Sequence, residues 1–271
     1  MRLLLAAAIT TLLLEIAAGT PEGEAVPSLS LGRYPFELLC THIYSDGGRP
    51  AGKAKLEVPF VNDFPPALTI GLETGKEPDG AGRFLILSSN YLRVYNIRDV
   101  KTAPYKTIQA SIAGLEKVLK ERPKNASDAH PKLKKPDVVY ELPYYPPRNA
   151  GHLIEAKLNY VDAPWGSGIC YITQFVQGMG ETPNNQQLIY VCQGISKKKG
   201  VFVSADFQIS HPDVPVDTKS PSFDWRKPGE QEAAKAFCQK NERLLDIALD
   251  ESFTPSLRSL REWLLSLKLQ E

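Results

Sequence analysis

Four short segments rich in β-branched and aromatic residues follow one another in the second half of the chain, and they constrain the fold more than any other sequence feature. The segments cover residues 156–161, 169–176, 187–193 and 201–209. The links between them carry residues that favour turns, such as glycine, proline and asparagine. Parallel neighbours would need crossover connections of a dozen or more residues, and these links are shorter. The sequence therefore predicts an antiparallel meander.

The two central segments of this meander carry one cysteine each. If Phe175 lies opposite Gln187 across the loop, then Cys170 lies opposite Cys192. Opposed residues of antiparallel strands have Cα atoms about 4.5–5.5 Å apart, a separation that a disulfide accepts. We therefore predict a Cys170–Cys192 disulfide, and the two cysteines that remain would form the pair Cys40 and Cys238. The alternative is that the cysteines are reduced and serve as small apolar core residues.

A change of period predicts helices on both sides of the meander. Residues 105–122 show the spacing of three and four that is typical of one stripe of an amphipathic helix. A second helical pattern begins at Glu230, and Thr254 and Pro255 start a final helix as its N-cap and first residue. The apolar positions are Ile108, Ile112, Leu115 and Leu119, then Ala233, Phe237, Leu244 and Ala248, and finally Leu257, Leu260, Leu264 and Leu267. We predict an α+β fold, with the 105–122 helix and the C-terminal helices packed on one face of the sheet.

The first residues of the chain are typical of a secretory signal peptide. Arg2 supplies a positive charge, an apolar run covers residues 3–14, and small residues follow at Ala17 and Gly19. Because small residues at these two positions suit signal peptidase, we predict cleavage after Gly19.

The sequence leaves two alternatives to this cleavage. Cleavage after Ala25 is a second option, and an uncleaved membrane anchor is the other. A membrane span needs about 20 apolar residues, and Glu15 ends this run early. We expect a signal peptide over 1–19, a flexible lead-in over 20–32 and a single α+β domain over 33–271. The mature chain would have no membrane span and would be secreted or periplasmic.

Charge and motif content exclude several classes of function. The 32 basic and 31 acidic residues leave a formal net charge of +1, and a nucleic-acid binder would need a basic excess. The four histidines lack the i, i+4 spacing of a helical metal site, and the four cysteines form no C-x-x-C pair. No nucleophile elbow, Walker loop or dinucleotide fingerprint occurs. We therefore predict no catalytic, cofactor-binding or metal-binding residues.

Aromatic residues near the start of the meander are the remaining candidates for a binding site. Tyr140, Tyr144, Tyr145 and Trp165 combine apolar rings with polar atoms, a combination that suits protein or glycan partners. We predict a binding surface at these four residues. The alternative is that the tyrosines are ordinary strand residues that face a core.

Several motifs in this half of the chain resemble those of a bacterial protein family. The segments are Gly168–Phe175 (GICYITQF), Leu188–Ile195 (LIYVCQGI), Gly200–Pro215 (GVFVSADFQISHPDVP) and Leu142–Ala150 (LPYYPPRNA). They resemble an uncharacterised family of bacterial secreted proteins and lipoproteins over about residues 84–215, most clearly over 142–215. The resemblance implies export and supplies no catalytic residues. It does not imply a lipid anchor, because no cysteine lies near the predicted cleavage site.

Together these patterns lead to two functional hypotheses. The first is an exported, non-catalytic binding or envelope-associated protein with an unknown protein or glycan partner and no cofactor. The second is a secreted hydrolase whose site is not visible as a motif. A pocket where histidine, cysteine or carboxylates converge would favour the hydrolase, and a flat aromatic surface would favour the binding protein.

Overall fold

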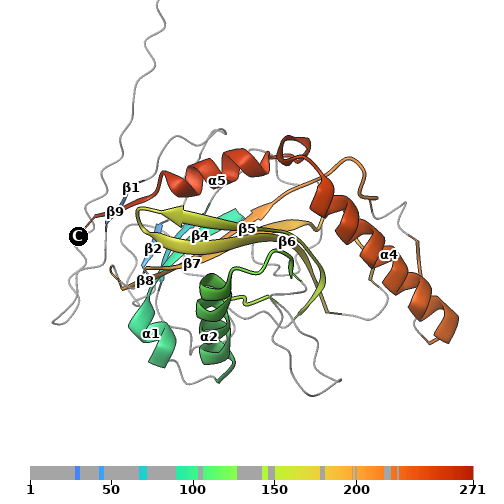
Figure 1. The fold of residues 1–271 in the computed structure, drawn as a ribbon, viewed down its shortest axis with the longest axis horizontal. Helices are drawn as coiled ribbons and strands as arrows, with labels where there is room; N and C mark the ends of the chain where they lie inside the picture. Colours follow the sequence, from blue (N-terminus) through green and yellow to red (C-terminus); the bar gives the residue numbers. More distant parts are fainter. Residues whose placement is uncertain are drawn as a thin grey trace, which may run out of the picture.

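The computed structural model describes residues 28–30, 43–45, 67–71, 90–102, 106–126, 142–145, 150–177, 181–196, 198, 200–216, 221–224 and 226–270. The predicted signal peptide lies outside these residues, as do Cys40 and Tyr140. Part of the predicted flexible lead-in is a strand, because β1 (Ser28–Ser30) pairs antiparallel with β9 (Lys268–Gln270). Figure 1 shows this pair at one end of the molecule.

The central sheet has seven strands in the order β2-β3-β4-β8-β7-β6-β5, and all neighbours are antiparallel. The strands β5 to β8 form the predicted meander, so the predicted α+β class is confirmed. β4 pairs with β8, which joins the first part of the chain to the meander. The bounds are β2 Ile43–Ser45, β3 Ala67–Gly71, β4 Asn90–Asn96, β5 Gly151–Ala163, β6 Gly166–Val176, β7 Ile189–Ser196 and β8 Val201–Gln208.

The register between β6 and β7 is the predicted one. Cys170 lies opposite Cys192, and Ile172 lies opposite Tyr190. The Cα atoms of the two cysteines are 4.1 Å apart, so the pair lies at disulfide distance. A shift of one residue would have moved one cysteine to the other face of the sheet. The apolar pattern and the loop between the strands were therefore sufficient to place the pair.

Helices precede and follow the meander. α2 (Lys106–Glu121) matches the predicted 105–122 helix, and the short α1 (Ile97–Thr102) leads into it. After the meander come α4 (Pro228–Ile247), the single 3₁₀ turn η2 (Asp250–Ser252) and α5 (Leu257–Leu265). None of the helices in the described ranges combines the length and apolar character that a membrane crossing requires.

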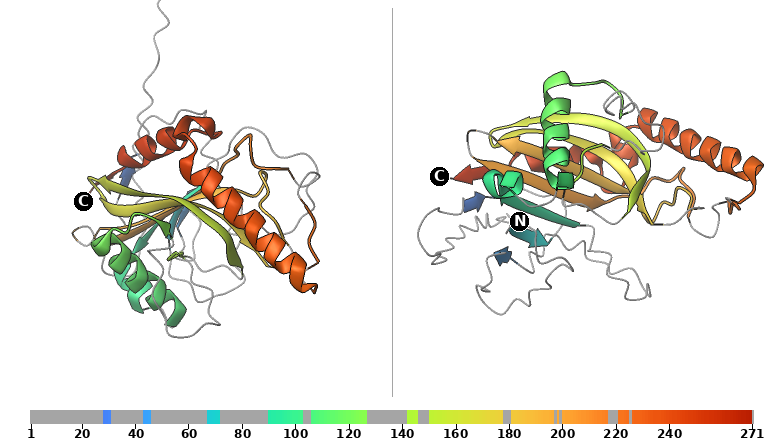
Figure 2. Two further views of the ribbon diagram at one scale, coloured as in Figure 1. Left: turned by 45° about the vertical axis from the view of Figure 1, so that its right-hand side comes forward. Right: turned by 90° about the horizontal axis from the view of Figure 1, so that it is seen from below.

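The helices cover both faces of the sheet (Figure 1). On β6, Cys170 and Ile172 belong to the core that contains α4 and α5, whereas Ile169 and Tyr171 belong to the core that contains α2. The C-terminal helices thus share one face, as expected, and α2 lies on the opposite face rather than beside them. Figure 2 shows the same separation from two further directions.

The central strands explain why both faces need a cover. Every residue of β7 is buried, and so is every residue of β8 except its last. A sheet with one wet face would alternate buried and exposed residues, and strands buried on both faces read as continuous apolar runs. The helix stripes predicted from the sequence show that each helix packs on something, but they do not say on which face.

Candidate functional site

The predicted aromatic binding surface is wrong for the three residues that the structure describes. Tyr144, Tyr145 and Trp165 are 7%, 0% and 3% exposed, so their rings belong to the two cores and cannot contact a partner. Tyr140 lies outside the described residues. The alternative reading of the tyrosines, as core residues, is the one that the structure supports.

Residues 142–145 lie against the α2 face of the sheet, and polar side chains hold them there. The hydroxyl of Tyr144 donates to Asp206 Oδ2 at 2.6 Å. Ser204 Oγ and Gln193 Nε2 both donate to the carbonyl oxygen of Tyr145 at 2.7 Å. Asp206 and Ser204 are fully buried, so each of these groups needs a partner inside the protein. These polar residues therefore fix the segment and offer no open site.

A buried histidine and carboxylate hold the start of the same segment. His152 Nδ1 lies 2.5 Å from Glu155 Oε1, and that oxygen also accepts the Leu142 N–H at 2.5 Å. The side chains of His152 and Glu155 are only 2% and 7% exposed. A substrate could not reach this pair without moving the segment above it, so we assign it a structural role.

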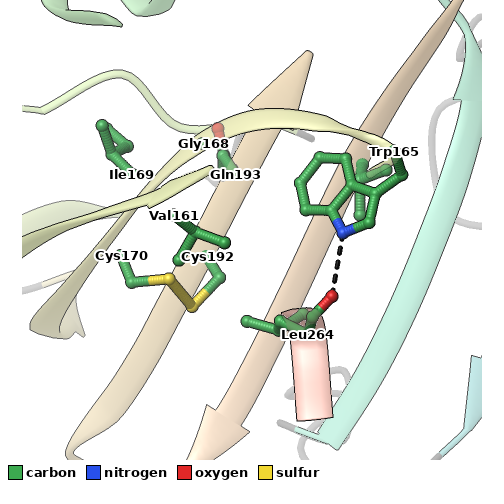
Figure 3. Close-up of a pocket in the computed structure, with 9 residues that line it drawn as sticks. Val161, Trp165, Gly168, Ile169, Cys170, Cys192, Gln193 and Leu264 are labelled. Atoms are coloured by element: carbon green, nitrogen blue, oxygen red, sulfur yellow. Dashed lines mark hydrogen bonds between the residues drawn. A yellow bond between two sulfur atoms is a disulfide. The ribbon is translucent and has the colours of Figure 1, made fainter. Parts of the chain in front are cut away.

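The cysteine pair borders a small void on the other face (Figure 3). Trp165 Nε1 donates to the carbonyl oxygen of Leu264 at 2.8 Å, which fastens α5 over the pair. Gly194 makes room for the indole, because a Cβ there would lie 2.5 Å from Trp165 Cη2. The void measures about 10 Å³, about the space of one water molecule. It is therefore a packing defect and not a ligand site.

Only one cysteine of the second predicted disulfide lies within the described residues. Cys238 is buried and has no disulfide partner among the described residues, and Cys40 lies outside them. The pairing of Cys40 with Cys238 stays a prediction. Burial raises the pKa of the Cys238 thiol to about 11, so this cysteine is not a reactive thiolate at neutral pH.

A groove of about 290 Å³ lies where α4 ends and the chain turns toward α5. Apolar side chains form most of it, and two of them form an exposed lip: Ile247 is 84% exposed and Leu249 is 74% exposed. An antiparallel bridge between Ser210 and Thr254 brings the end of the meander to this turn. The lining residues are His211, Asp213, Leu244, Ile247, Ala248, Leu249 and Ser252.

A serine, a histidine and an aspartate meet in this groove, which invites comparison with a hydrolase triad. His211 Nε2 lies 2.9 Å from Ser252 Oγ. In a triad the histidine accepts the serine proton, and a buried carboxylate binds the other ring nitrogen. The Asp213 carboxylate is 4.0 Å from His211 Nδ1 and its side chain is 70% exposed, so it is not such a carboxylate.

The hydrogen bonds of the groove run in the direction opposite to that of a triad. The Asp213 N–H donates to His211 Nδ1 at 3.3 Å, so this nitrogen is an acceptor and the ring proton is on Nε2. The Ser252 hydroxyl donates to the carbonyl oxygen of Leu249 at 2.7 Å. Nε2 therefore donates to Ser252 and cannot take its proton. This arrangement holds the turn in place and does not activate a nucleophile.

Within the described residues, the groove carries one exposed charged side chain, that of Asp213, because His211 is neutral. Burial lowers the pKa of His211, an effect that Asp213 partly opposes, so the imidazole is neutral at neutral pH. Asp213 is then the only ionised side chain among the described residues that line the groove. Asp246, next to the lip, adds a second carboxylate at the surface.

Lys157 anchors the end of α4 that carries the lip. Its backbone has φ 59°, an uncommon conformation for a residue other than glycine. There its N–H donates to Asp246 Oδ1 at 2.6 Å, and its Nζ donates to the carbonyl oxygens of Asp246 and Ala248. A cation at the C-terminus of a helix also interacts favourably with the helix dipole. The conformation of Lys157 is thus maintained by its contacts with α4.

The η2 turn is anchored from the sheet in a similar way. Asp250 pairs with Arg261 and with Lys157 Nζ, the latter at 3.6 Å. Arg261 donates to the hydroxyl of Tyr190 at 3.3 Å. Burial raises the pKa of Tyr190 to about 12, so its hydroxyl stays neutral and accepts this bond. The groove therefore sits on a rigid polar support that reaches β7.

Comparisons of this chain with protein-family models, with curated proteins and with solved structures give no match. The resemblance to a bacterial exported family therefore stays a prediction. The described residues also hold no group of three or more histidine, cysteine, aspartate or glutamate side chains suited to a metal ion.

Little in the sequence predicts this groove. Its residues come from two separate stretches, 211–213 and 244–252, and they match no motif. The helical pattern itself predicts the opposite for the lip. Ile247 follows Leu244 by three residues, a spacing that places both on one face of a helix. The structure instead leaves Ile247 84% exposed, because α4 buries the face that carries Leu245.

Proposed function

We propose that the protein is exported and works outside the cytoplasm as a non-catalytic binding or envelope-associated protein, with the His211 groove as its binding site. Three observations support export. The first residues are typical of a signal peptide, Cys170 and Cys192 lie at disulfide distance, and several motifs resemble those of exported bacterial proteins. Disulfides persist in oxidising compartments and are rare in the cytosol.

The observation that carries the binding function is the apolar lip of the groove. Ile247 and Leu249 are the two most exposed large apolar residues that the structure describes, and both border one groove. Apolar surface that stays exposed beside a concave, polar-edged site is typical of an interaction site. The polar groups beneath it are engaged with one another, so the groove can accept a partner without chemistry.

A secreted hydrolase is the second candidate, because Ser252, His211 and Asp213 share the groove. Catalysis would need the imidazole to change its tautomer and the serine to leave the Leu249 carbonyl. A fluorophosphonate probe tests this directly, since it labels activated serines. We expect no labelling of the wild-type protein. Labelling that disappears in the Ser252→Ala variant would support the hydrolase instead.

Export is tested separately with the chain carrying its own first residues. We expect the protein to accumulate outside the cytoplasm and its N-terminal sequence to begin at Thr20. Alkylation of the native protein should leave Cys170 and Cys192 unmodified until a reductant and a denaturant are both added. An intact Met1 on a cytoplasmic protein with free thiols at both positions would contradict export.

A further inference from the structure

The shape of the groove limits what can occupy it. Its volume of about 290 Å³ is at the lower end of the range for small-molecule pockets, about 300–1,000 Å³. The apolar surface continues beyond the groove, because the side chains of Ile247 and Leu249 are 84% and 74% exposed. A small ligand that filled the groove would leave these two side chains in water. An occupant that extends past the groove would cover them.

The charge of the rim limits the occupant further. Asp213 and Asp246 are exposed carboxylates at the groove and beside its lip. No lysine or arginine lines the groove among the described residues, and the Lys157 ammonium is engaged with the carbonyl oxygens of α4. Asp213 is therefore the only charged side chain among the described residues that line the groove when His211 is neutral, and a basic group on the occupant would be attracted to it.

The lip is held in place before any partner arrives. Lys157 fixes the last carbonyl groups of α4, and Asp250 fixes the turn through Arg261. Ile247 and Leu249 lie between these two anchors in the sequence. A pre-organised site loses less conformational entropy on binding than a flexible one. This rigidity favours a partner that adapts to the groove, such as an extended chain.

From these three features we infer that the groove binds an extended polypeptide segment of another protein, in which an apolar side chain is followed by lysine or arginine. The apolar side chain enters the groove between Leu244 and Ser252, and the neighbouring residues cover Ile247 and Leu249. The basic side chain lies at Asp213. This inference rests on the proposed binding function and names the chemistry of its partner.

Methyl NMR of the purified full chain tests the inference with a defined probe. The probe is acetyl-Gly-Leu-Lys-Gly-amide, and its counterpart carries Glu in place of Lys. We expect the Lys peptide to shift the methyl signals of Ile247 and Leu249 and to bind several-fold more tightly than the Glu peptide. Leu249→Ser should weaken binding about tenfold or more, since it removes an apolar contact. Asp213→Asn should weaken binding of the Lys peptide about two- to fivefold.

Matched variants separate the groove from the rest of the surface. Leu265→Ser removes a large apolar side chain that is 41% exposed and lies outside the groove. Glu232→Gln removes an exposed charge near the other end of α4. Neither should change peptide binding. All four altered side chains are exposed at the surface, that of Leu265 to 41%, so the unfolding midpoints should stay close to that of the wild type.

Three results would overturn the inference. One is equal binding of the Lys and Glu peptides, and another is the absence of shifts at Ile247 and Leu249. The third is that vesicles of phosphatidylglycerol bind the protein and shift these methyl signals when the peptides do not, which would make the groove a membrane contact. Each of these results leaves the export and labelling experiments unaffected, so failure of the inference is distinguishable from failure of the proposed function.

Discussion

The two long C-terminal helices lie on the same face of the sheet and are held there by different forces. The nine residues of α5 bury four large side chains, each at most 1% exposed, whereas the twenty residues of α4 bury a smaller and more polar set. The buried residues are Leu257, Leu260, Trp263 and Leu264 in α5, and Ala234, Cys238, Asn241 and Leu245 in α4. Burial of large apolar side chains is therefore the main attachment of α5 and only part of the attachment of α4.

α4 gains the rest of its attachment from the edge of the sheet. β5 is an edge strand, and α4 lies along it (Figure 2). The N–H groups of Glu155 and Lys157 donate to Glu242 and Asp246 at 3.1 and 2.6 Å. Carboxylates four residues apart on a helix are about 6 Å apart along its axis, close to the spacing of alternate residues on a strand. α4 thus supplies acceptors that a further strand would otherwise provide.

A helix can thus be attached to a sheet by buried apolar volume or by hydrogen bonds, and the two kinds of attachment suit different tasks. A helix held by its apolar stripe must stay in place for the core to stay dry. A helix held largely by polar bonds can extend past the core and carry exposed side chains. The exposed side chains of the groove, Ile247 and Leu249, accordingly lie at or just after the end of α4, the helix held largely by polar bonds.

The largest expected effect concerns the apolar attachment of α5. Trp263→Ala should lower the free energy of unfolding by about 3–5 kcal/mol, and Leu264→Ala by about 2–5 kcal/mol, because each leaves a cavity in the core. The control is Leu265→Ala, whose side chain is 41% exposed and should cost little. Urea unfolding measures all three. Equal midpoints for the three variants would mean that α5 is peripheral.

The cysteine pair beneath α5 should give the next largest effect. Replacing both Cys170 and Cys192 with alanine should lower the free energy of unfolding by about 2–4 kcal/mol, because the disulfide restricts the unfolded chain. The two residues are 1% and 4% exposed, so reductants should reach them only after unfolding. Unfolding of the double variant, and of the wild type with and without reductant, measures this. Wild-type protein that is equally stable in both conditions would contradict the pairing.

A smaller effect is expected for the polar attachment of α4. Asp246→Ala removes the acceptor of the Lys157 N–H and should lower the free energy of unfolding by about 1–2 kcal/mol. This is the lower part of the range for hydrogen bonds to charged groups, because Asp246 is exposed. Hydrogen exchange at the Lys157 amide should become about tenfold faster, and exchange in α5 should not change. The matched control is Glu232→Ala, which removes a carboxylate near the N-terminus of α4. If both helices exchanged faster in Asp246→Ala, the two attachments would not be independent.

The smallest effect concerns the junction between the two helices, where His211 bonds to Ser252. Desolvation lowers the pKa of His211 below its ordinary value of 6.5, so the unfolded chain binds a proton at higher pH than the folded protein does. The stabilisation from the neutral imidazole is complete above about pH 6.5 and is lost as the pH falls through 6.5 toward the folded pKa. His211→Gln should lose less stability than the wild type between pH 8 and pH 5. Identical pH profiles of the urea midpoint would show that His211 does not titrate with unfolding.

The helices also show which parts of the fold were predictable. The predicted stripe of α5 is buried, because its apolar residues are large and regularly spaced, and Trp263, one residue off that stripe, is buried with them. The face of α4 was displaced by one residue, since Ala233, Phe237, Leu244 and Ala248 are less buried than the set that includes Cys238 and Asn241. Asn241 satisfies its amide by donating to the carbonyl oxygen of Phe237. A pattern search for apolar residues cannot anticipate a buried amide of this kind.

The candidate site was less predictable than the fold for a physical reason. The meander and the Cys170–Cys192 register depend on local alternation and on one short loop. The groove depends on where two distant stretches meet, and that is decided by the Ser210–Thr254 bridge and by the way α4 lies along β5. The prediction for Tyr144 and Tyr145 was wrong because they lie in an irregular segment, 142–145, which is buried by tertiary packing with α2 and the sheet that no local pattern reveals.

The pairing of β4 with β8 determines how early during synthesis the central sheet can be completed. All of residues 97–200 must be synthesised before the two strands can meet, because β4 covers residues 90–96 and β8 covers residues 201–208. Contacts between such distant segments carry a large loop-closure cost and slow folding. A chain that emerges N-terminus first would keep its early strands unpaired with the meander until late in synthesis. A chain that has to cross a membrane unfolded would benefit from this delay.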